Sequence, residues 1–481
     1  MNKTLASLAS LVAFGLSLSA CNSTSGTPGV GALPNAATSQ AKQAGRHMGP
    51  NDNGPQSLHA GGATFPAEAY NTASQPVGLY SSPQAPPGSG SLFANYGGTG
   101  TIFYCLTGSG AGRKQFDGDP ARLPGNAACA GLGDTPTGFG GRGEPLDFLA
   151  SDVMISSAEY ATYASNRKST QGEPFMFPTL GGPIVYGYRP GDFTISPTRL
   201  HLSTWTYCAI ANGTVGNWND PAITADNGGT VVSGSAPITF YYRSDGSGTT
   251  QIFVNHIFVT CGNSWPAPYN AAPYESPGHS AQWTFPNSTG NWTGPTGTVS
   301  SGSTFVGANG NPGVLAGIQS TQYGTGYVEG AYARQANPKV SQAILQNGQT
   351  GSTPIWSDPT NHKNVAAALA KVNSKKISYG ECDDLVSCGT SRPECDLYVP
   401  FTTFQSPPSG AYPIVGLSYI LFYGKNNAHF SDDHTLATYL TTTPANAIIN
   451  KLEYVALNAS IHTAVTTALN GHGSVTPCLA Q

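Results

Sequence analysis

Charged residues are scarce in this sequence. Lys, Arg, Asp and Glu make up 10% of the 481 residues, and the formal net charge is −4. So little charge provides no basic surface for a nucleic acid, and we expect no such partner. The absence of a heptad pattern and of any repeat of fixed period argues against coiled-coil and repeat architectures. Hydrophobic residues at 39% and aromatic residues at 10% still suffice for buried cores.

Motifs for several kinds of chemistry are also missing. The ten His residues form no cluster with metal-ligand spacing, and no Ser has a His or Asp partner evident in the sequence. No Gly-Lys-Ser/Thr follows a Gly-rich loop at the spacing of a P-loop. Nucleophilic hydrolysis needs a nucleophile activated by a base or a metal. We therefore expect no catalytic residue, no metal and no cofactor.

The N-terminus carries the one extended apolar stretch. Lys3 precedes an uncharged run at residues 5–18, which two small residues follow. This run is shorter than the about 20 apolar residues of a membrane span, and it predicts a secretory signal peptide at residues 1–20. Cys21 then stands as in the lipobox of bacterial lipoproteins, whose Cys is acylated, and two or more acyl chains anchor a protein stably. The alternative is an ordinary signal peptide with Cys21 incidental.

The chain after the signal peptide divides into a tether and a long folded part. Residues 21–57 are rich in Ser, Thr, Gly, Pro, Ala and Asn and predict a flexible tether. About 425 residues remain, enough for two domains. The 60 Gly and 37 Pro residues indicate a loop-rich, exported chain, with long loops expected at 80–92, 120–143 and 265–303.

Nine cysteines occur, and eight remain when Cys21 is set aside. An even number in an exported chain predicts disulfides. The eight are Cys105, Cys129, Cys208, Cys261, Cys382, Cys388, Cys395 and Cys478. Their pairing is open, although Cys105 with Cys129 and Cys208 with Cys261 would each close a loop. The cluster at 382, 388 and 395 could instead bind a metal, but its spacing matches no common zinc signature.

Strand-like and helix-like segments alternate along the folded part. Expected strands lie at 101–104, 183–188, 238–243 and 414–422, and expected helices at 249–259, 365–372 and 445–457. Such alternation predicts α/β units with mostly parallel sheets.

The most informative segment is Tyr-Tyr-Arg-Ser-Asp-Gly-Ser-Gly-Thr-Thr at residues 241–250, between an expected strand and an expected helix. A helix that begins near Gly248 would direct unpaired backbone N–H groups and its positive dipole end at an anion. Ser247 and Thr249 add hydroxyl donors, and Arg243 adds a planar fork of N–H donors. The segment therefore predicts an anion site, although many such turns only cap a helix.

Three further segments have a similar character. Residues 61–66 read Gly-Gly-Ala-Thr-Phe-Pro, residues 107–112 read Thr-Gly-Ser-Gly-Ala-Gly before an expected helix start at 113–116, and residues 147–152 end in Asp152. Each also has an ordinary interpretation: a strand-entry turn, a Gly-rich turn, or a helix N-cap at Asp152.

Together these segments resemble the phosphate-binding proteins of Pst-type ABC importers. That family has Gly-Ala-Thr-Phe-Pro, Gly-Ser-Gly-Ala-Gly-x-Lys-Gln, Asp-Phe-x-x-Ser-Asp and Arg-x-Asp-Gly-Ser-Gly-Thr in this order, and all four occur here. Similar segments at 216–223, 324–333 and 412–414 extend the resemblance over residues 58–423. The chain departs from the family in a long interval between Phe65 and Ser109, an apparent insertion at 265–303, and its eight cysteines. A second Gly-rich string at 97–101 competes with residues 108–110 for the first turn, but only the latter precedes Lys-Gln at the family spacing.

The resemblance implies an α/β type II periplasmic binding protein with two lobes, mixed sheets flanked by helices and a two-strand hinge. Lobe one is expected at residues 58–180 and 413–481, and lobe two at 181–412. The implied phosphate ligands are Thr64, Phe65, Ser109 and Asp152 from lobe one and Arg243, Ser247, Gly248 and Thr249 from lobe two. Asp152 would accept the proton that phosphate carries and sulfate lacks. Asp245 would orient Arg243 or cap the following helix.

The implied protein is a monomer in the periplasm or cell envelope, held to the membrane by its lipid anchor. It would capture inorganic phosphate between its lobes and deliver it to an ABC permease of the Pst type. Two alternatives from other classes are an exported phosphatase on the same scaffold and an adhesion or secretion-accessory protein that keeps only the fold.

Overall fold

The computed structural model describes residues 57–72, 87–118, 146–195, 199–261, 287, 289–299, 302–374, 378–379, 395–400, 403–404, 406–427, 429–471, 473 and 476–481. The expected signal peptide, Cys21, the tether up to residue 56, Cys129, Cys382, Cys388 and the loop at 120–143 lie outside these residues. None of the described helices combines the length and apolar character that a membrane span requires.

The described strands form three sheets. The largest contains β1 (Ser57–Gly62), β2 (Thr101–Cys105), β3 (Phe148–Ser151), β4 (Phe175–Tyr188), β6 (Thr239–Arg243), β7 (Gly297–Thr298), β8 (Thr304–Ala308), β9 (Gly324–Glu329), β10 (Ser341–Gln342), β15 (Val415–Phe422) and β16 (Val455–Ala456). The second contains β5 (His201–Leu202), β11 (Ile344–Thr350) and β12 (Thr353–Ser357), and the third β13 (Ser378–Tyr379) and β14 (Leu397–Tyr398).

The described α-helices accompany these strands along the chain. They are α2 (Ser109–Asp117), α3 (Ser157–Asn166), α4 (Lys168–Gln171), α5 (Thr204–Ala211), α6 (Pro221–Asp226), α7 (Gly248–Cys261), α8 (Gly310–Ser320), α9 (Gly330–Gln335), α10 (His362–Ala368), α11 (Ala370–Ser374), α12 (Phe430–Tyr439), α13 (Thr443–Lys451) and α14 (Ala459–Asn470). Short turns of other helix types occur at Glu68–Thr72 and Pro190–Asp192.

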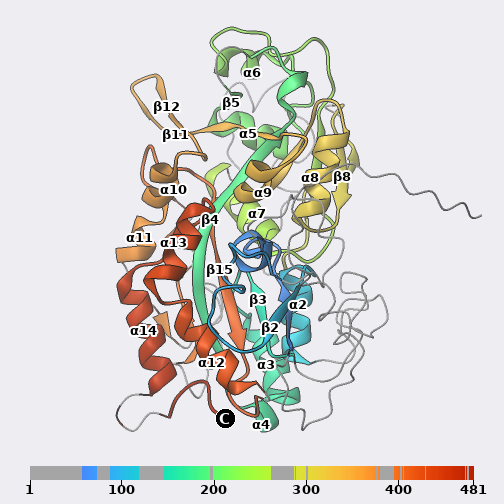
Figure 1. The fold of residues 1–481 in the computed structure, drawn as a ribbon. Helices are drawn as coiled ribbons and strands as arrows, with labels where there is room; N and C mark the ends of the chain where they lie inside the picture. Colours follow the sequence, from blue (N-terminus) through green and yellow to red (C-terminus); the bar gives the residue numbers. More distant parts are fainter. Residues whose placement is uncertain are drawn as a thin grey trace, which may run out of the picture. The chain divides into compact units, whose positions relative to one another are not determined.

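The large sheet has two halves joined by β4. Its order is β2-β1-β3-β15-β4-β9-β6-β8-β7, with β10 and β16 also paired to β4. β4 pairs with β15 over residues 175–183 and with β9 over residues 184–188. Figure 1 shows β4 and β15 running beside each other, with α12, α13 and α14 on one side and α2 and α3 on the other. β4 is therefore the strand on which the chain passes from one half of the sheet to the other.

Strand directions correct the expectation of a mostly parallel sheet. β1, β2 and β3 are parallel to one another, as are β6, β8 and β9. β15, however, is antiparallel to both β3 and β4, and β4 is antiparallel to β9. The reason is topological: β4 carries the chain out of the first half and β15 carries it back. The sheet is therefore mixed, as the fold class predicted.

Burial explains why β4 and β15 read as nearly continuous apolar runs. Every residue of both strands is buried, which is the pattern of strands covered on both faces. The expected strands at 101–104, 183–188, 238–243 and 414–422 appear as β2, part of β4, β6 and β15, and the expected helix at 249–259 appears as α7.

Three expectations about helices were wrong in their bounds. The helix expected at 445–457 ends at Lys451, because Glu453 has φ 72° and Val455 joins the sheet beside β4. The helix expected at 365–372 divides into α10 and α11 around Leu369. The helix expected to begin near residue 113 begins at Ser109.

Disulfides connect segments that are distant in sequence. Cys208 is bonded to Cys261, which ties α5 to the end of α7, and Cys395 is bonded to Cys478. Cys105 is also disulfide-bonded. Because Cys395 forms a disulfide, it is not a free thiolate for the metal site considered from its spacing.

Residues 395–400 were expected to belong to lobe two, yet their contacts are with the first half of the sheet. Asp396 forms an isolated bridge with Met176 of β4, and the Val399 N–H donates to the Tyr419 hydroxyl of β15 at 3.3 Å. Together with the Cys395–Cys478 disulfide, these contacts attach the segment to the part of the chain assigned to lobe one.

Candidate anion-binding site

The predicted site residues follow the carboxyl ends of parallel strands. Thr64 follows β1, Ser109 follows β2, Asp152 follows β3 and Arg243 ends β6. Ligands of α/β proteins bind beyond these ends, because the loops there meet the N-termini of the next helices. Here α2 and α7 begin at Ser109 and Gly248, so two positive helix ends lie among the predicted residues.

Arg243 is the buried cation of the site, with 1% exposure. Its Nε donates to Asp245 Oδ1 at 2.6 Å, and its Nη2 pairs with Asp245 Oδ2. Its Nη1 donates to Thr64 Oγ1 at 3.0 Å across the two halves of the sheet. A guanidinium has five N–H groups. The contacts with Asp245 and Thr64 use three of them. The other two bond to no described residue and are therefore available to a ligand. Asp245 thus contacts the Arg243 guanidinium with both of its carboxyl oxygens.

Asp245 also contacts a helix N-terminus, but not that of the following helix. Its Oδ1 accepts from the Gly310 N–H at the start of α8 at 2.9 Å. Asp245 therefore accepts from the first turn of α8 as well as from Arg243.

Asp152 is a buried carboxyl surrounded by hydroxyl donors. Its Oδ2 accepts from Ser109 Oγ at 3.0 Å and Thr249 Oγ1 at 3.3 Å, and its Oδ1 accepts from Ser418 Oγ at 3.2 Å. Burial raises the pKa of Asp152 from 3.8 to about 6, although the charge of Arg243 and the three hydroxyls act to lower it. The ordinary interpretation of Asp152 as an N-cap does not hold, because Ser156 caps α3.

The loops from the two halves touch directly. The Gly110 N–H donates to the Gly246 carbonyl at 2.8 Å. A Cβ at Gly248 would lie 2.6 Å from Asp152 Cβ and 2.9 Å from Ser109 Oγ, so only glycine allows this approach. The structure thus brings Thr64, Ser109 and Asp152 together with the 243–249 loop.

Two further predicted residues, Phe65 and Ser247, are held near the site by hydrogen bonds of their own. Phe65 is fully buried, and its carbonyl accepts from the Tyr454 hydroxyl at 2.7 Å. Ser247 Oγ accepts from the Thr250 N–H at 3.2 Å, which leaves its own hydroxyl proton available to a ligand. The competing string at 97–101 lies elsewhere, since the Thr99 N–H donates to Asp432 at 2.7 Å.

The sequence interpretation missed residues that hold the site in place. Ser418 is a polar residue in the otherwise apolar β15, and this contrast was the available signal. The Tyr327 hydroxyl accepts from the Arg243 N–H at 3.0 Å and is bonded to Thr250 Oγ1 at 2.6 Å. Arg113 binds Glu159 at 2.9 Å and Ser151 Oγ at 3.0 Å, which braces the end of β3. None of these partners is close in sequence to the residue it supports.

A return arm, defined as residues 287 and 289–299, contacts the loop before α7. The Gly290 carbonyl accepts from the Ser247 N–H at 2.9 Å. Asn287 Oδ1 accepts from the Gly290 N–H at 2.9 Å, and the Asn287 N–H donates to Asn255 of α7 at 2.8 Å. Trp292 stacks on Tyr242 with ring centroids 4.9 Å apart. The end of the apparent insertion therefore fixes Ser247.

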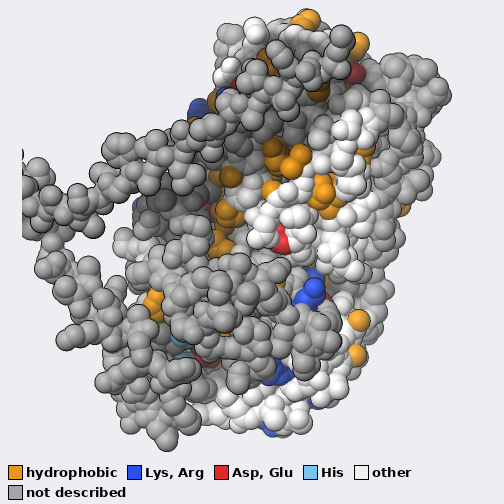
Figure 2. Space-filling view, turned by 90° about the vertical axis from the view of Figure 1, so that its right-hand side faces the viewer, with side chains coloured by type: hydrophobic (Ala, Val, Ile, Leu, Met, Phe, Trp, Pro, Cys, Tyr) orange, Lys and Arg blue, Asp and Glu red, His pale blue; other side chains and the backbone are white. Residues whose placement is uncertain are grey.

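Charge elsewhere on the described surface is sparse. On the face shown in Figure 2, the Lys and Arg side chains of described residues are few and separated. The described residues on this face therefore form no continuous basic surface of the kind that a polyanion needs.

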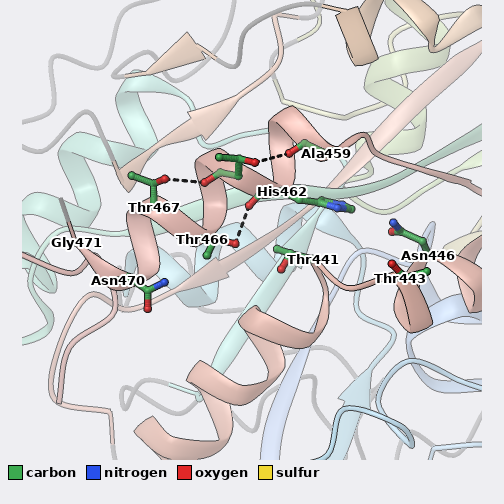
Figure 3. A pocket seen from close by; sticks show the side chains of 10 residues that line it. Thr441, Thr443, Asn446, Ala459, His462, Thr466, Thr467, Asn470 and Gly471 are labelled. Atoms are coloured by element: carbon green, nitrogen blue, oxygen red, sulfur yellow. Dashed lines mark hydrogen bonds between the residues drawn. The ribbon is translucent and has the colours of Figure 1, made fainter.

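An open groove of about 580 Å³ lies between α13 and α14, far from these loops in sequence (Figure 3). No Lys, Arg, Asp or Glu lines it. The hydroxyls of Thr463, Thr466 and Thr467 donate to carbonyls of their own helix. The groove therefore lacks the charged donors of the candidate site.

Comparison with known proteins identifies the class. A family model described as a PBP superfamily domain matches residues 55–441. Since this covers most of the chain, the chain belongs to the PBP superfamily. The mixed sheet crossed by β4 and β15 fits the two-lobed architecture of that class.

The relatives in sequence are mostly phosphate-binding proteins of the PstS type. PstS 3 of Mycobacterium tuberculosis is 27% identical over 427 residues, which cover 88% of this chain and 86% of that protein. PstS 3 of Mycobacterium leprae is 26% identical over 328 residues, covering 68% and 66%. Alkaline phosphatase L of Pseudomonas aeruginosa is 27% identical over 201 residues, covering 42% of each.

A solved phosphate-binding protein, PfluDING with bound phosphate, has the same fold. Its TM-score is 0.61 at 18% identity, covering 89% of this chain and 99% of that one. The comparisons thus confirm the resemblance to PstS-like phosphate-binding proteins and favour a binding protein over an enzyme.

Proposed function

We propose that this protein is an exported, lipid-anchored binding protein that captures inorganic phosphate between two lobes and delivers it to an ABC permease of the Pst type. The observation that carries the proposal is the buried pair of Arg243 and Asp152, with the hydroxyls of Ser109 and Thr249 bonded to Asp152. Phosphate at neutral pH carries both negative charge for a guanidinium and a proton for a carboxylate. Few other anions would satisfy both groups.

The proposed contacts follow from the available donors. Arg243 donates through its two remaining N–H groups, and Thr64, Ser109, Ser247 and Thr249 donate through hydroxyls or backbone N–H groups. Phe65 and Gly248 donate through backbone N–H groups, and Asp152 accepts. Asp245 holds Arg243 in position without contacting phosphate.

The proposed lobes follow the two halves of the sheet. Lobe one comprises residues 58–180 and 413–481, to which we add 395–400 because of their contacts with β4 and β15. Lobe two comprises the remainder of 181–412. Because the ligands come from both lobes, phosphate stabilises the closed arrangement, which the permease would recognise.

Calorimetry on phosphate-stripped protein tests this function. We expect one phosphate bound per chain and no hydrolysis of a phosphomonoester by the same preparation. Turnover that is lost in Ser247→Ala would support the phosphatase alternative, to which the partial match with alkaline phosphatase L gives some weight. Absence of both binding and turnover would support a protein that retains only the fold.

Gly290→Ala should weaken phosphate binding about tenfold through Ser247. Gly290 has φ 73°, and an added Cβ would lie 2.6 Å from the Ser247 carbonyl oxygen, so the arm must move away from the loop. The hydrogen bond to the Ser247 N–H would be lost with it. Gly351→Ala is the control, because Gly351 also has positive φ but no atom within 4 Å of an added Cβ. Equal phosphate dissociation constants for both variants would contradict a role for the arm.

Cys21→Ala should move the protein from the membrane fraction to the soluble fraction. The variant removes the acylation site, and with it the apolar chains that hold the protein at the bilayer. Fractionation followed by immunoblotting measures the shift. If wild type and variant distribute alike, the proposed lipid anchor is wrong. That result would not bear on the proposal that the protein binds phosphate.

A further inference from the structure

Asn311 lies beside the proposed phosphate ligands although no sequence pattern singled it out. It is the second residue of α8, which follows β8 in the way that the site loop follows the parallel strand β6. The Asn311 N–H approaches Thr64 Oγ1 at 3.4 Å, and the neighbouring Gly310 N–H donates to Asp245. Thr64 and Asp245 both bind the Arg243 guanidinium through their side chains.

The carboxamide of Asn311 has no partner among the described residues. The residue is 0% exposed, and neither Oδ1 nor Nδ2 makes a hydrogen bond. Buried polar groups are nearly always paired, and one that is not needs an explanation. By contrast, the carboxamide of the buried Asn255 bonds to the backbone of Asn287, and that of the buried Asn287 accepts from the Gly290 N–H and donates to the Asn291 carbonyl.

We propose that Asn311 is a further phosphate ligand, whose Nδ2 donates to a phosphate oxygen beside Arg243. This inference rests on the proposed function of the site. It explains why a costly unpaired amide is kept at this point, since the bound anion would satisfy it. It also places the N-terminus of a third helix, α8, next to the anion, where its positive dipole end is favourable.

The test compares Asn311→Leu with wild type by calorimetry with inorganic phosphate and by thermal unfolding. Leu has the same number and branching of side-chain heavy atoms as Asn but no polar atoms, so removal of an unpaired buried amide should leave the phosphate-free melting temperature the same or raise it. The phosphate dissociation constant should increase about tenfold or more, as for loss of a hydrogen bond to a charged group. Asn311→Asp should bind more weakly still, because it cannot donate when ionised and adds a negative charge.

Matched measurements separate this inference from the function on which it rests. Asn212→Leu is the control, because Asn212 is 3% exposed with an unpartnered Nδ2 but lies at the end of α5; its phosphate affinity should not change. If Asn311→Leu does not fold, Asn311→Ala replaces it, with the phosphate-induced rise in melting temperature as readout. Wild-type affinity in a folded Asn311→Leu or Asn311→Asp protein would overturn the inference. Failure of wild type to bind phosphate would instead overturn the proposed function.

Discussion

Arg243→Ala is expected to weaken phosphate binding at least about a hundredfold. Two N–H groups of Arg243 remain after its contacts with Asp245 and Thr64. Each charge-assisted hydrogen bond contributes roughly 1.5–3 kcal/mol, and about 1.4 kcal/mol corresponds to a tenfold change in the dissociation constant. The loss is large because the guanidinium is buried, where water cannot replace it.

Two companion variants make the Arg243 result interpretable. Arg243→Lys keeps the charge but not the planar fork that binds Asp245 and ligand together, so its affinity should fall between wild type and Arg243→Ala. Arg334→Ala removes an exposed guanidinium paired with Glu453 and should leave phosphate affinity unchanged. Calorimetry would measure all three. Normal binding by a folded Arg243→Ala protein would remove Arg243 from the site.

Sulfate is expected to bind at least about 10⁴-fold more weakly than phosphate at pH 7, and Asp152→Asn should reduce this ratio. A site that requires one hydrogen bond can reject an analogue that lacks it by about that factor. Sulfate has no proton for Asp152, so the carboxylate would face an anion without a hydrogen bond. Asn presents an N–H₂ donor that sulfate can use, while its carbonyl still accepts from phosphate. The ratio of the two dissociation constants, measured in both proteins, decides the role of Asp152.

The pKa of Asp152 adds a pH dependence to this prediction. Since burial raises it from 3.8 to about 6, wild type should reject sulfate less strongly as the pH falls through about 6 and the carboxyl gains its own proton. Asp152→Asn should show no such change. A ratio that is independent of pH in wild type, or identical in both proteins, would show that Asp152 does not detect the phosphate proton.

The same pKa shift predicts how phosphate-free stability varies with pH. The folded protein holds the Asp152 proton more tightly than the unfolded chain, so this residue favours folding below about pH 4. That contribution is lost as the pH rises from about 4 to about 6. For a pKa change of this size, the free energy of unfolding falls by roughly 3 kcal/mol. Asp152→Asn should therefore unfold at a higher temperature than wild type at pH 7 and lose this advantage at low pH.

The four Gly-rich and acidic segments could be recognised from sequence because each is local. Arg243, Ser247 and Thr249 lie within one strand-to-helix turn, and its residue types alone predict anion chemistry. β15 and the second part of β4 could be recognised because strands buried on both faces are mostly apolar. The placement of residues 395–400 was less accessible, since a disulfide to Cys478 and a bridge to Met176 attach them to distant parts of the chain.

Residues whose role depends on distant partners could not be found in this way. Ser418 acts on Asp152 from 266 positions away, and Asn311 approaches Thr64 from 247 positions away. The contrast of Ser418 with its apolar strand marks it as unusual but does not reveal its partner, and a single Asn after a Gly carries no such contrast. Gly290 is a similar case. Its carbonyl accepts a hydrogen bond from the Ser247 N–H, and this contact depends on the tertiary fold rather than on the local sequence.

The backbone hydrogen bond from Gly110 to Gly246 also bears on the size of the ligand that we expect at the proposed site. It fixes the separation of the two loops through main-chain atoms, so no side-chain rotation can widen the gap. Gly248 tightens the limit, because even one methyl group there would lie 2.6 Å from Asp152 Cβ. A sugar phosphate or nucleotide carries a bulky substituent on one phosphate oxygen, which these closely spaced loops would have to accommodate. If the site binds phosphate as proposed, we therefore expect it to favour the free anion over its esters.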